Sequence, residues 1–158
     1  MKCSGHYTNS VRALQQAQRA GFDDAILLNT KGDVAEGSGA NLFLVKGGRV
    51  ITNDREASIV MGITRDSVIT IAKDLGIPVD VRPMTEAYLR GADEVFFSGT
   101  AVEVTPITQV DQQVYGGGKP GAITRRIQET YFEAVHGKLP RYASWLSSVK
   151  SPTALVSS

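Results

Sequence analysis

The sequence is poor in the residues on which several common kinds of site depend. Its 158 residues include one cysteine, two histidines and one tryptophan. A single cysteine, Cys3, excludes an internal disulfide. The two histidines, His6 and His136, are far apart, so they give no metal-ligand spacing and make a serine–histidine triad hard to assemble. No metal site is therefore predicted.

Concentrated positive charge and long apolar runs are also missing. There are 17 Lys and Arg against 16 Asp and Glu, and no basic run exceeds two residues, which argues against nucleic acid as the main partner. No apolar segment is long enough to cross a bilayer, and residues 1–10 are polar rather than signal-like. We therefore expect a soluble, cytoplasmic chain with no membrane partner.

What is present indicates one folded domain. The hydrophobic fraction of 42% is enough to bury a core, which excludes intrinsic disorder. Apolar spacing and glycine stops predict helices at residues 8–20, 64–75, 84–89 and 123–135. Strands are expected at residues 24–29, 42–45, 50–52, 77–81, 94–97 and 102–110, and a loop of small residues at 34–41. Strands in hairpins with helices between them predict a mixed α/β fold.

Two short segments could cradle an anion. Residues 62–66 (Gly-Ile-Thr-Arg-Asp) place backbone N–H groups and a threonine hydroxyl at the start of a predicted helix, where unpaired N–H groups and the helix dipole favour phosphate. Taken alone, that segment is more typical of an ordinary threonine N-cap than of a phosphate site. Residues 98–101 (Ser-Gly-Thr-Ala) form a strand-end turn with a hydroxyl and a glycine, which by itself is typical of a plain turn. Residues 36–39 have neither Rossmann nor P-loop spacing.

Taken in order, six segments resemble the class IV (fold type IV) aminotransferases that depend on pyridoxal phosphate, and among them the branched-chain amino-acid aminotransferases most. The segments are residues 2–7, 21–28, 34–43, 62–66, 92–101 and 103–106. The resemblance continues to about residue 149, since residues 137–145 are similar to the closing segment of the family. It implies the pseudo-barrel large domain of fold type IV enzymes, similar to D-amino-acid aminotransferase.

The resemblance also implies a cofactor, pyridoxal 5′-phosphate, and the residues that bind it. Lys2 corresponds to the catalytic lysine that condenses with the aldehyde and moves the substrate's Cα proton. Tyr7 corresponds to the partner of the phenolic oxygen, and Glu36 to the carboxylate that faces the pyridine nitrogen. The other implied contacts are Val60 on the ring, Ile63, Thr64 and Thr100 on the phosphate, and Gly99, Thr100 and Ala101 on the substrate carboxylate.

The implied reaction is ping-pong transamination of Leu, Ile or Val with 2-oxoglutarate. Other members of the same architecture are D-amino-acid aminotransferases, amine transaminases and aminodeoxychorismate lyases. Members of the family carry a smaller N-terminal domain before the lysine. We therefore expect residues 1–149 to be the C-terminal cofactor-binding domain, residues 150–158 to be a flexible tail, and the small domain to be absent or supplied by a separate chain.

That expectation leaves two views of this chain. It is an impaired enzyme that forms a homodimer or larger homo-oligomer, or a non-catalytic domain that needs a partner chain. Three positions depart from the family pattern: His6 and Ala40, where asparagine and glutamate are usual, and Met61, where proline is common. None of these changes removes a group with an implied catalytic role.

Overall fold

The computed structural model describes residues 7–149. The predictions for Lys2 and for the tail at 150–158 lie outside these residues. The helices are α1 (Tyr7–Arg19), α2 (Ile63–Asp74), α3 (Glu86–Arg90) and α4 (Ala122–Val135), with short 3₁₀ helices η2 (Arg55–Ala57) and η3 (Pro140–Trp145). The strands are β1 (Ile26–Leu28), β2 (Val34–Gly37), β3 (Asn41–Lys46), β4 (Arg49–Thr52), β5 (Val79–Val81), β6 (Glu94–Gly99), β7 (Glu103–Ile107), β8 (Gln109–Val110) and β9 (Gln113–Val114).

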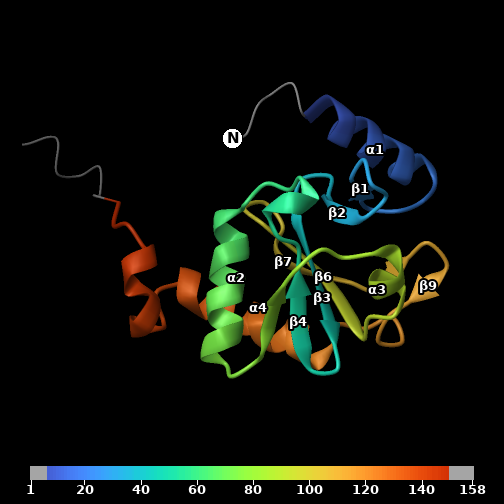
Figure 1. Ribbon diagram of the computed structural model, residues 1–158. Helices are drawn as coiled ribbons and strands as arrows, with labels where there is room; N and C mark the ends of the chain where they lie inside the picture. Colours follow the sequence, from blue (N-terminus) through green and yellow to red (C-terminus); the bar gives the residue numbers. More distant parts are fainter. Residues whose placement is uncertain (1–6, 150–158) are drawn as a thin grey trace, which may run out of the picture.

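A five-stranded mixed sheet in the order β5-β4-β3-β6-β7 forms the centre of the molecule (Figure 1). Strand β3 pairs antiparallel with β4 and β6, β6 pairs antiparallel with β7, and β5 is parallel to β4. Pro78 precedes β5 and cannot donate to a ladder, and β5 is an edge strand, as predicted. The mixed α/β class predicted from the sequence is confirmed.

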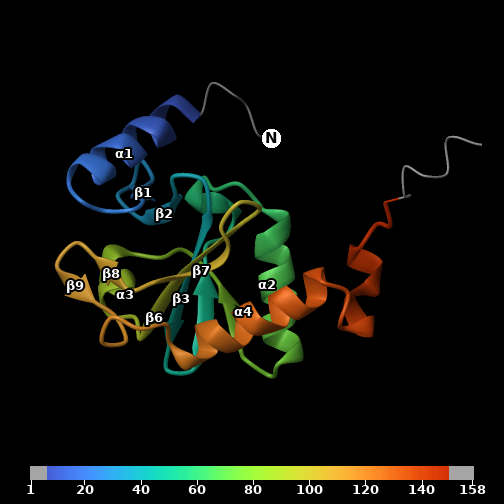
Figure 2. The ribbon, with the colours of Figure 1, turned by 180° about the vertical axis from the view of Figure 1, so that it is seen from behind.

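Both faces of this sheet are covered, and a separate hydrophobic core lies on each face. Helices α2 and α4 pack on one face of the sheet (Figure 2). The core on this face includes Phe43 and Phe96, whose rings stack with centroids 4.9 Å apart. On the other face Leu42, Leu44 and Phe97 pack with residues of β2, α3 and the segment around Tyr115. Strand β3 is therefore buried on both sides, and its sequence shows no alternation of polar and apolar residues.

The start of α4 is held by a carboxylate from the sheet. Glu94, the first residue of β6, accepts hydrogen bonds from the backbone N–H groups of Ile123 (3.1 Å) and Thr124 (2.7 Å). A Cβ on Gly121 would overlap the Glu94 carboxyl group, so a larger residue there would displace the Glu94 side chain from the helix start. A negative charge at a helix N-terminus also interacts favourably with the helix dipole.

Three expectations about local structure are wrong. Residues 34–37 form strand β2 rather than a loop, because they pair antiparallel with β1, and the buried side chain of Asn53 donates hydrogen bonds to the carbonyls of Val34 (2.7 Å) and Ala35 (2.5 Å). Residues 102–110 divide into β7 and β8 instead of forming one strand. The α2 N-cap is Gly62, and Thr64 lies inside the first turn.

Helix α1 differs from its prediction in packing rather than position. It begins within a residue of the expected start, but none of its residues is buried, and Val11 on its apolar stripe is 46% exposed. Strand β1 is shorter than predicted and only partly buried. Within residues 7–149, the structure contains no helix with the length and apolar character needed to span a membrane.

Candidate active site

Two turns meet at one end of the central sheet. Asn41 at the start of β3 pairs with Ser98 near the end of β6. A Cβ on Gly99 would lie 3.5 Å from the carbonyl oxygen of Gly39 and 3.6 Å from the Cα of Ala40. The turn between β2 and β3 therefore lies against the turn between β6 and β7. This packing brings the segment that carries Glu36 beside residues 99–101.

Three residues at this end form a closed set of hydrogen bonds. The Asn41 side chain donates through Nδ2 to the Val60 carbonyl (2.6 Å) and to Glu36 Oε2 (3.2 Å). The Val60 N–H donates to the same Glu36 oxygen (3.0 Å). The carboxylate that the resemblance assigns to the pyridine nitrogen is thus bonded to the segment that carries Val60.

The N-terminus of α2 follows directly from this set. A Cβ on Gly62 would lie 2.4 Å from Asn41 Oδ1, so Asn41 also packs against the residue that begins the helix. Gly62 provides no side-chain cap, and the first N–H groups of an α-helix have no acceptor within the helix. Thr64 is buried in the first turn, whereas the Ile63 side chain is 87% exposed. The structure therefore places an uncapped helix start next to Glu36 and Val60.

Arg65 lies beside the helix start and is 2% exposed. Its Nη2 donates to the Asn53 carbonyl (2.7 Å), and its Nη1 forms an ion pair with Asp66 (3.1 Å). Asn53 in turn binds the backbone just before Glu36 through the carbonyls of Val34 and Ala35. Arg65 thus connects α2 to β2 within the protein.

The remaining predicted site residues are placed as follows. Thr100 and Ala101 lie on the exposed turn after β6, and Gly99 is the last residue of β6. Tyr7 is the first residue of α1, and its side chain is 46% exposed. Lys2 lies outside the described residues. No group of three or more His, Cys, Asp or Glu side chains suited to a metal ion occurs in the part of the chain described.

Asn41 is the residue that sequence reasoning missed. Its signal was a polar side chain at the start of the apolar run Leu42–Val45, and the structure shows that this side chain is 5% exposed. A buried amide needs hydrogen-bond partners, so a polar residue at such a position indicates a specific contact. The partners lie 5 and 19 residues away in the sequence.

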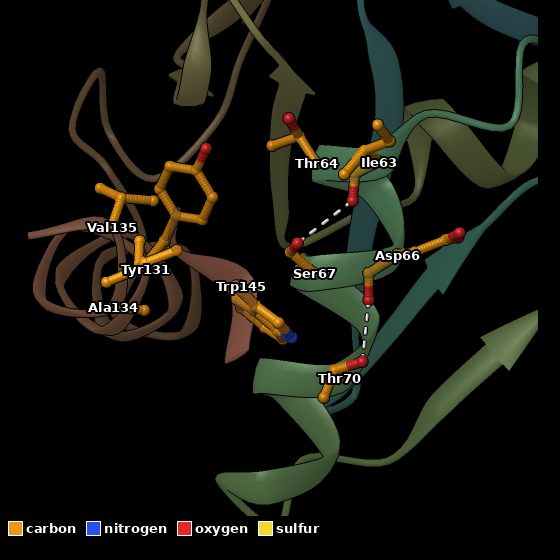
Figure 3. A pocket seen from close by; sticks show the side chains of 10 residues that line it. Ile63, Thr64, Asp66, Ser67, Thr70, Tyr131, Ala134, Val135 and Trp145 are labelled. Atoms are coloured by element: carbon orange, nitrogen blue, oxygen red, sulfur yellow. Dashed lines mark hydrogen bonds between the residues drawn. The ribbon is translucent and has the colours of Figure 1, made fainter. Parts of the chain in front are cut away.

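A groove of about 450 Å³ lies between α2, α4 and η3 (Figure 3). Figure 3 shows Trp145 lying between the two long helices, and Tyr131 of α4 lines the same groove. The hydroxyls of Ser67 and Thr70 line the groove but donate back to backbone carbonyls one turn earlier. Ile63 and Thr64, at the start of α2, line this groove, whereas Glu36, Asn41 and Val60 do not, so the groove and the hydrogen-bonded set meet only at the start of α2.

Comparisons with known proteins identify the family of this chain. Residues 2–110 match the family model for amino-transferase class IV. The chain is 48% identical to a probable branched-chain-amino-acid aminotransferase of Aquifex aeolicus, over 94% of this chain and 48% of that protein. It is 42% identical to the branched-chain-amino-acid aminotransferase of Pseudomonas aeruginosa, with the same coverage of both.

Solved structures give the same result. The branched-chain amino acid aminotransferase of T.th. complexed with N-(5′-phosphopyridoxyl)-L-glutamate superposes with a TM-score of 0.91 and 48% identity, over 94% of this chain and 50% of that one. The enzyme from Thermobaculum terrenum in its PLP form gives 0.92 and 40% identity, over 95% and 49% of the two chains.

The fold is shared with solved branched-chain amino acid aminotransferases. The chain belongs to the class IV aminotransferase family. It spans about half the length of the relatives it matches.

Proposed function

We propose that this chain binds pyridoxal 5′-phosphate and forms the cofactor-binding part of a branched-chain amino-acid aminotransferase. Its substrates in this proposal are Leu, Ile or Val and 2-oxoglutarate. The observation that carries the proposal is the hydrogen-bonded set of Glu36, Asn41 and Val60 beside the uncapped start of α2. Identity of 48% to a structure that contains a phosphopyridoxyl amino acid supports it.

The donor set fits the proposed cofactor at two points. A carboxylate suits a protonated pyridine nitrogen, and an uncapped helix start with a threonine in its first turn suits a phosphate. Ser98, directly before Gly99, adds a buried hydroxyl with no hydrogen-bond partner in the described structure. Buried polar groups in a protein core normally have hydrogen-bond partners within the protein. A carboxylate, an uncapped helix start and an unpartnered hydroxyl at one end of the sheet are therefore more typical of a ligand site than of a core.

When bound, pyridoxal phosphate supplies an electron sink for the negative charge that develops at the substrate Cα. In the proposal, Glu36 holds the proton on the ring nitrogen and so keeps that sink effective. Val60 covers one face of the ring. The N–H groups of Ile63 and Thr64 and the hydroxyls of Thr64 and Thr100 bind the phosphate.

The substrate and the proton are handled by other residues. The N–H groups of residues 99–101 bind the substrate carboxylate, which fixes the substrate's orientation. The Lys2 amine, in its neutral form, would take the proton from the substrate Cα and give a proton back in a later step of the reaction. Tyr7 donates to the phenolic oxygen of the cofactor.

The proposal extends to assembly. We infer that residues 1–149 act as one cofactor-binding domain and that a further domain, in the same or another chain, completes the substrate pocket, because this chain covers about half of each relative. The exposed side chains of Val60 (37%), Met61 (39%) and Ile63 (87%) beside the site are consistent with a homodimer or larger assembly. Light scattering after size-exclusion chromatography measures that assembly. A cytoplasmic location belongs to the same proposal.

Reductive labelling tests the cofactor site directly. The purified chain is mixed with pyridoxal phosphate, its visible spectrum is recorded, and borohydride reduction is followed by peptide mass spectrometry. Label on Lys2, with an absorption band that disappears on adding leucine, supports the proposal. Scattered label on Lys31, Lys46 and Lys119 contradicts it and favours a domain that binds no cofactor without a partner. A Lys2→Ala chain is the matched control and should lose the label.

A further inference from the structure

Asn41 occupies the centre of the hydrogen-bonded set at the sheet end. Its side chain is 5% exposed, and its Nδ2 donates to the Val60 carbonyl at 2.6 Å and to Glu36 Oε2 at 3.2 Å. Its Oδ1 faces Gly62 so closely that a Cβ there would lie 2.4 Å away. The amide therefore contacts the carboxylate, the Val60 segment and the residue that begins α2.

The effect of these contacts is on the orientation of the carboxylate. The last torsion of a glutamate side chain is broad and nearly two-fold, so an unrestrained carboxylate samples many orientations. Glu36 Oε2 accepts from Asn41 Nδ2 and from the Val60 N–H (3.0 Å). Two donors from different segments on one oxygen fix both the torsion and the distance between Glu36 and Val60.

We propose that Asn41 is a positioning residue that orients Glu36 toward the ring nitrogen of the cofactor. The proposal rests on the proposed function for the identity of the ligand. Asn41 itself contacts the carboxylate and the backbone, so it acts through Glu36. Because the same amide binds the Val60 carbonyl and packs on Gly62, it also keeps the carboxylate in a constant position relative to the start of α2.

A purely structural role for Asn41 predicts a different result. In that case its loss loosens the start of β3, and every ligand of the site is weakened alike. An analogue of pyridoxal phosphate that has C–H in place of the ring nitrogen separates the two roles. It keeps the aldehyde, the hydroxyl and the phosphate but offers nothing for Glu36 to bind.

The experiment compares the dissociation constants of pyridoxal phosphate and of this analogue for the unchanged chain and for Asn41→Ala. We expect the substitution to raise the dissociation constant of pyridoxal phosphate about tenfold, which is the scale of one hydrogen bond to a charged group. The dissociation constant of the analogue should rise less than about twofold. In a Glu36→Ala background, Asn41→Ala should have no further effect on pyridoxal phosphate. An equal loss for both ligands overturns the proposal.

Thr52→Val is the matched control. Thr52 is fully buried in the same sheet, and its hydroxyl donates to the Leu42 carbonyl (2.9 Å). We expect this variant to change the two dissociation constants in the same proportion. A selective loss for pyridoxal phosphate in Thr52→Val would show that any damage to β3 mimics the effect, and would also overturn the proposal.

Hydrogen exchange measured without pyridoxal phosphate tests the proposal even if the chain does not bind the cofactor. Hydrogen exchange of the Val60 N–H should speed up about tenfold in Asn41→Ala, because its acceptor is no longer fixed, while exchange along the β3–β6 ladder stays unchanged. Unchanged Val60 exchange overturns the proposal. If the unchanged chain binds no pyridoxal phosphate, the proposed function fails, and Val60 exchange still decides whether Asn41 fixes Glu36.

Discussion

Replacing Asn53 with alanine should lower the free energy of unfolding by about 3–5 kcal/mol. Asn53 is 1% exposed, and its side chain makes three hydrogen bonds to backbone groups: two to the carbonyls of Val34 (2.7 Å) and Ala35 (2.5 Å) and one from the Met84 N–H (3.1 Å). Each bond contributes about 1 kcal/mol net, and a buried group left without a partner costs about 1–3 kcal/mol. A loss of this size is a large part of the stability of a typical domain.

Urea unfolding followed by circular dichroism measures this loss, with the slope of the transition checked for constancy. Asn29→Ala is the matched control: Asn29 Oδ1 also accepts backbone hydrogen bonds, from Lys31 (2.9 Å) and Asp33 (3.0 Å), but in a turn that water can reach. We expect the control to lose less than about 1 kcal/mol. Equal losses in the two variants, or unchanged exchange of the Met84 N–H in Asn53→Ala, would refute the reasoning.

Three further outcomes are expected. Gly37→Ala should destabilise the chain by about 1–3 kcal/mol, because its Cβ would lie 2.6 Å from a phenylalanine ring of β6, whereas Gly39→Ala, with nothing within 4 Å, should be neutral in the same urea assay. The hydrogen bond from Arg49 holds the pKa of Asp80 below its usual value, so the pair stabilises the fold above pH about 4 and loses this effect as the pH falls through the lowered pKa. Asp80→Asn should therefore lower the melting temperature at pH 7 and leave it unchanged in strong acid; a difference that persists in acid contradicts the assignment. Thr64→Val should raise the dissociation constant of pyridoxal phosphate about 5- to 30-fold in a fluorescence titration, and an unchanged constant would remove Thr64 from the phosphate site.

The long helices were predictable because local signals define them. α2 and α4 begin and end within one residue of the expected positions, since apolar residues recur at helical spacing and glycine stands at their ends. Strand β2 was not predictable in this way. It pairs with β1, and its carbonyls accept hydrogen bonds from the side chain of Asn53, 18 and 19 residues further along, a contact that no local pattern records.

The residues of the candidate site also divide into those that local sequence signals indicate and those that depend on distant contacts. The start of α2 was located from the sequence at residues 62–66, but the N-cap position is Gly62 and not Thr64, so the helix start has no side-chain cap. The proximity of Glu36 to Val60 was implied only by family resemblance, because 24 residues separate them. Asn41 was missed since its amide reveals a role only when both its partners are known.

The burial of β3 on both faces has a consequence for strand register. In most sheets one polar face forbids a one-residue slip, because the slip would expose the core. From Asn41 to Val45 every residue of β3 is buried, so a slip would exchange one apolar face for another, and hydrophobicity alone selects against it weakly. Polar anchors must make the choice: the Thr52 hydroxyl on the Leu42 carbonyl and the Asn41 amide on the Val60 carbonyl. The register of the central strand thus rests on a few polar contacts rather than on its hydrophobic pattern, and the Asn41 amide of the proposed site is among them.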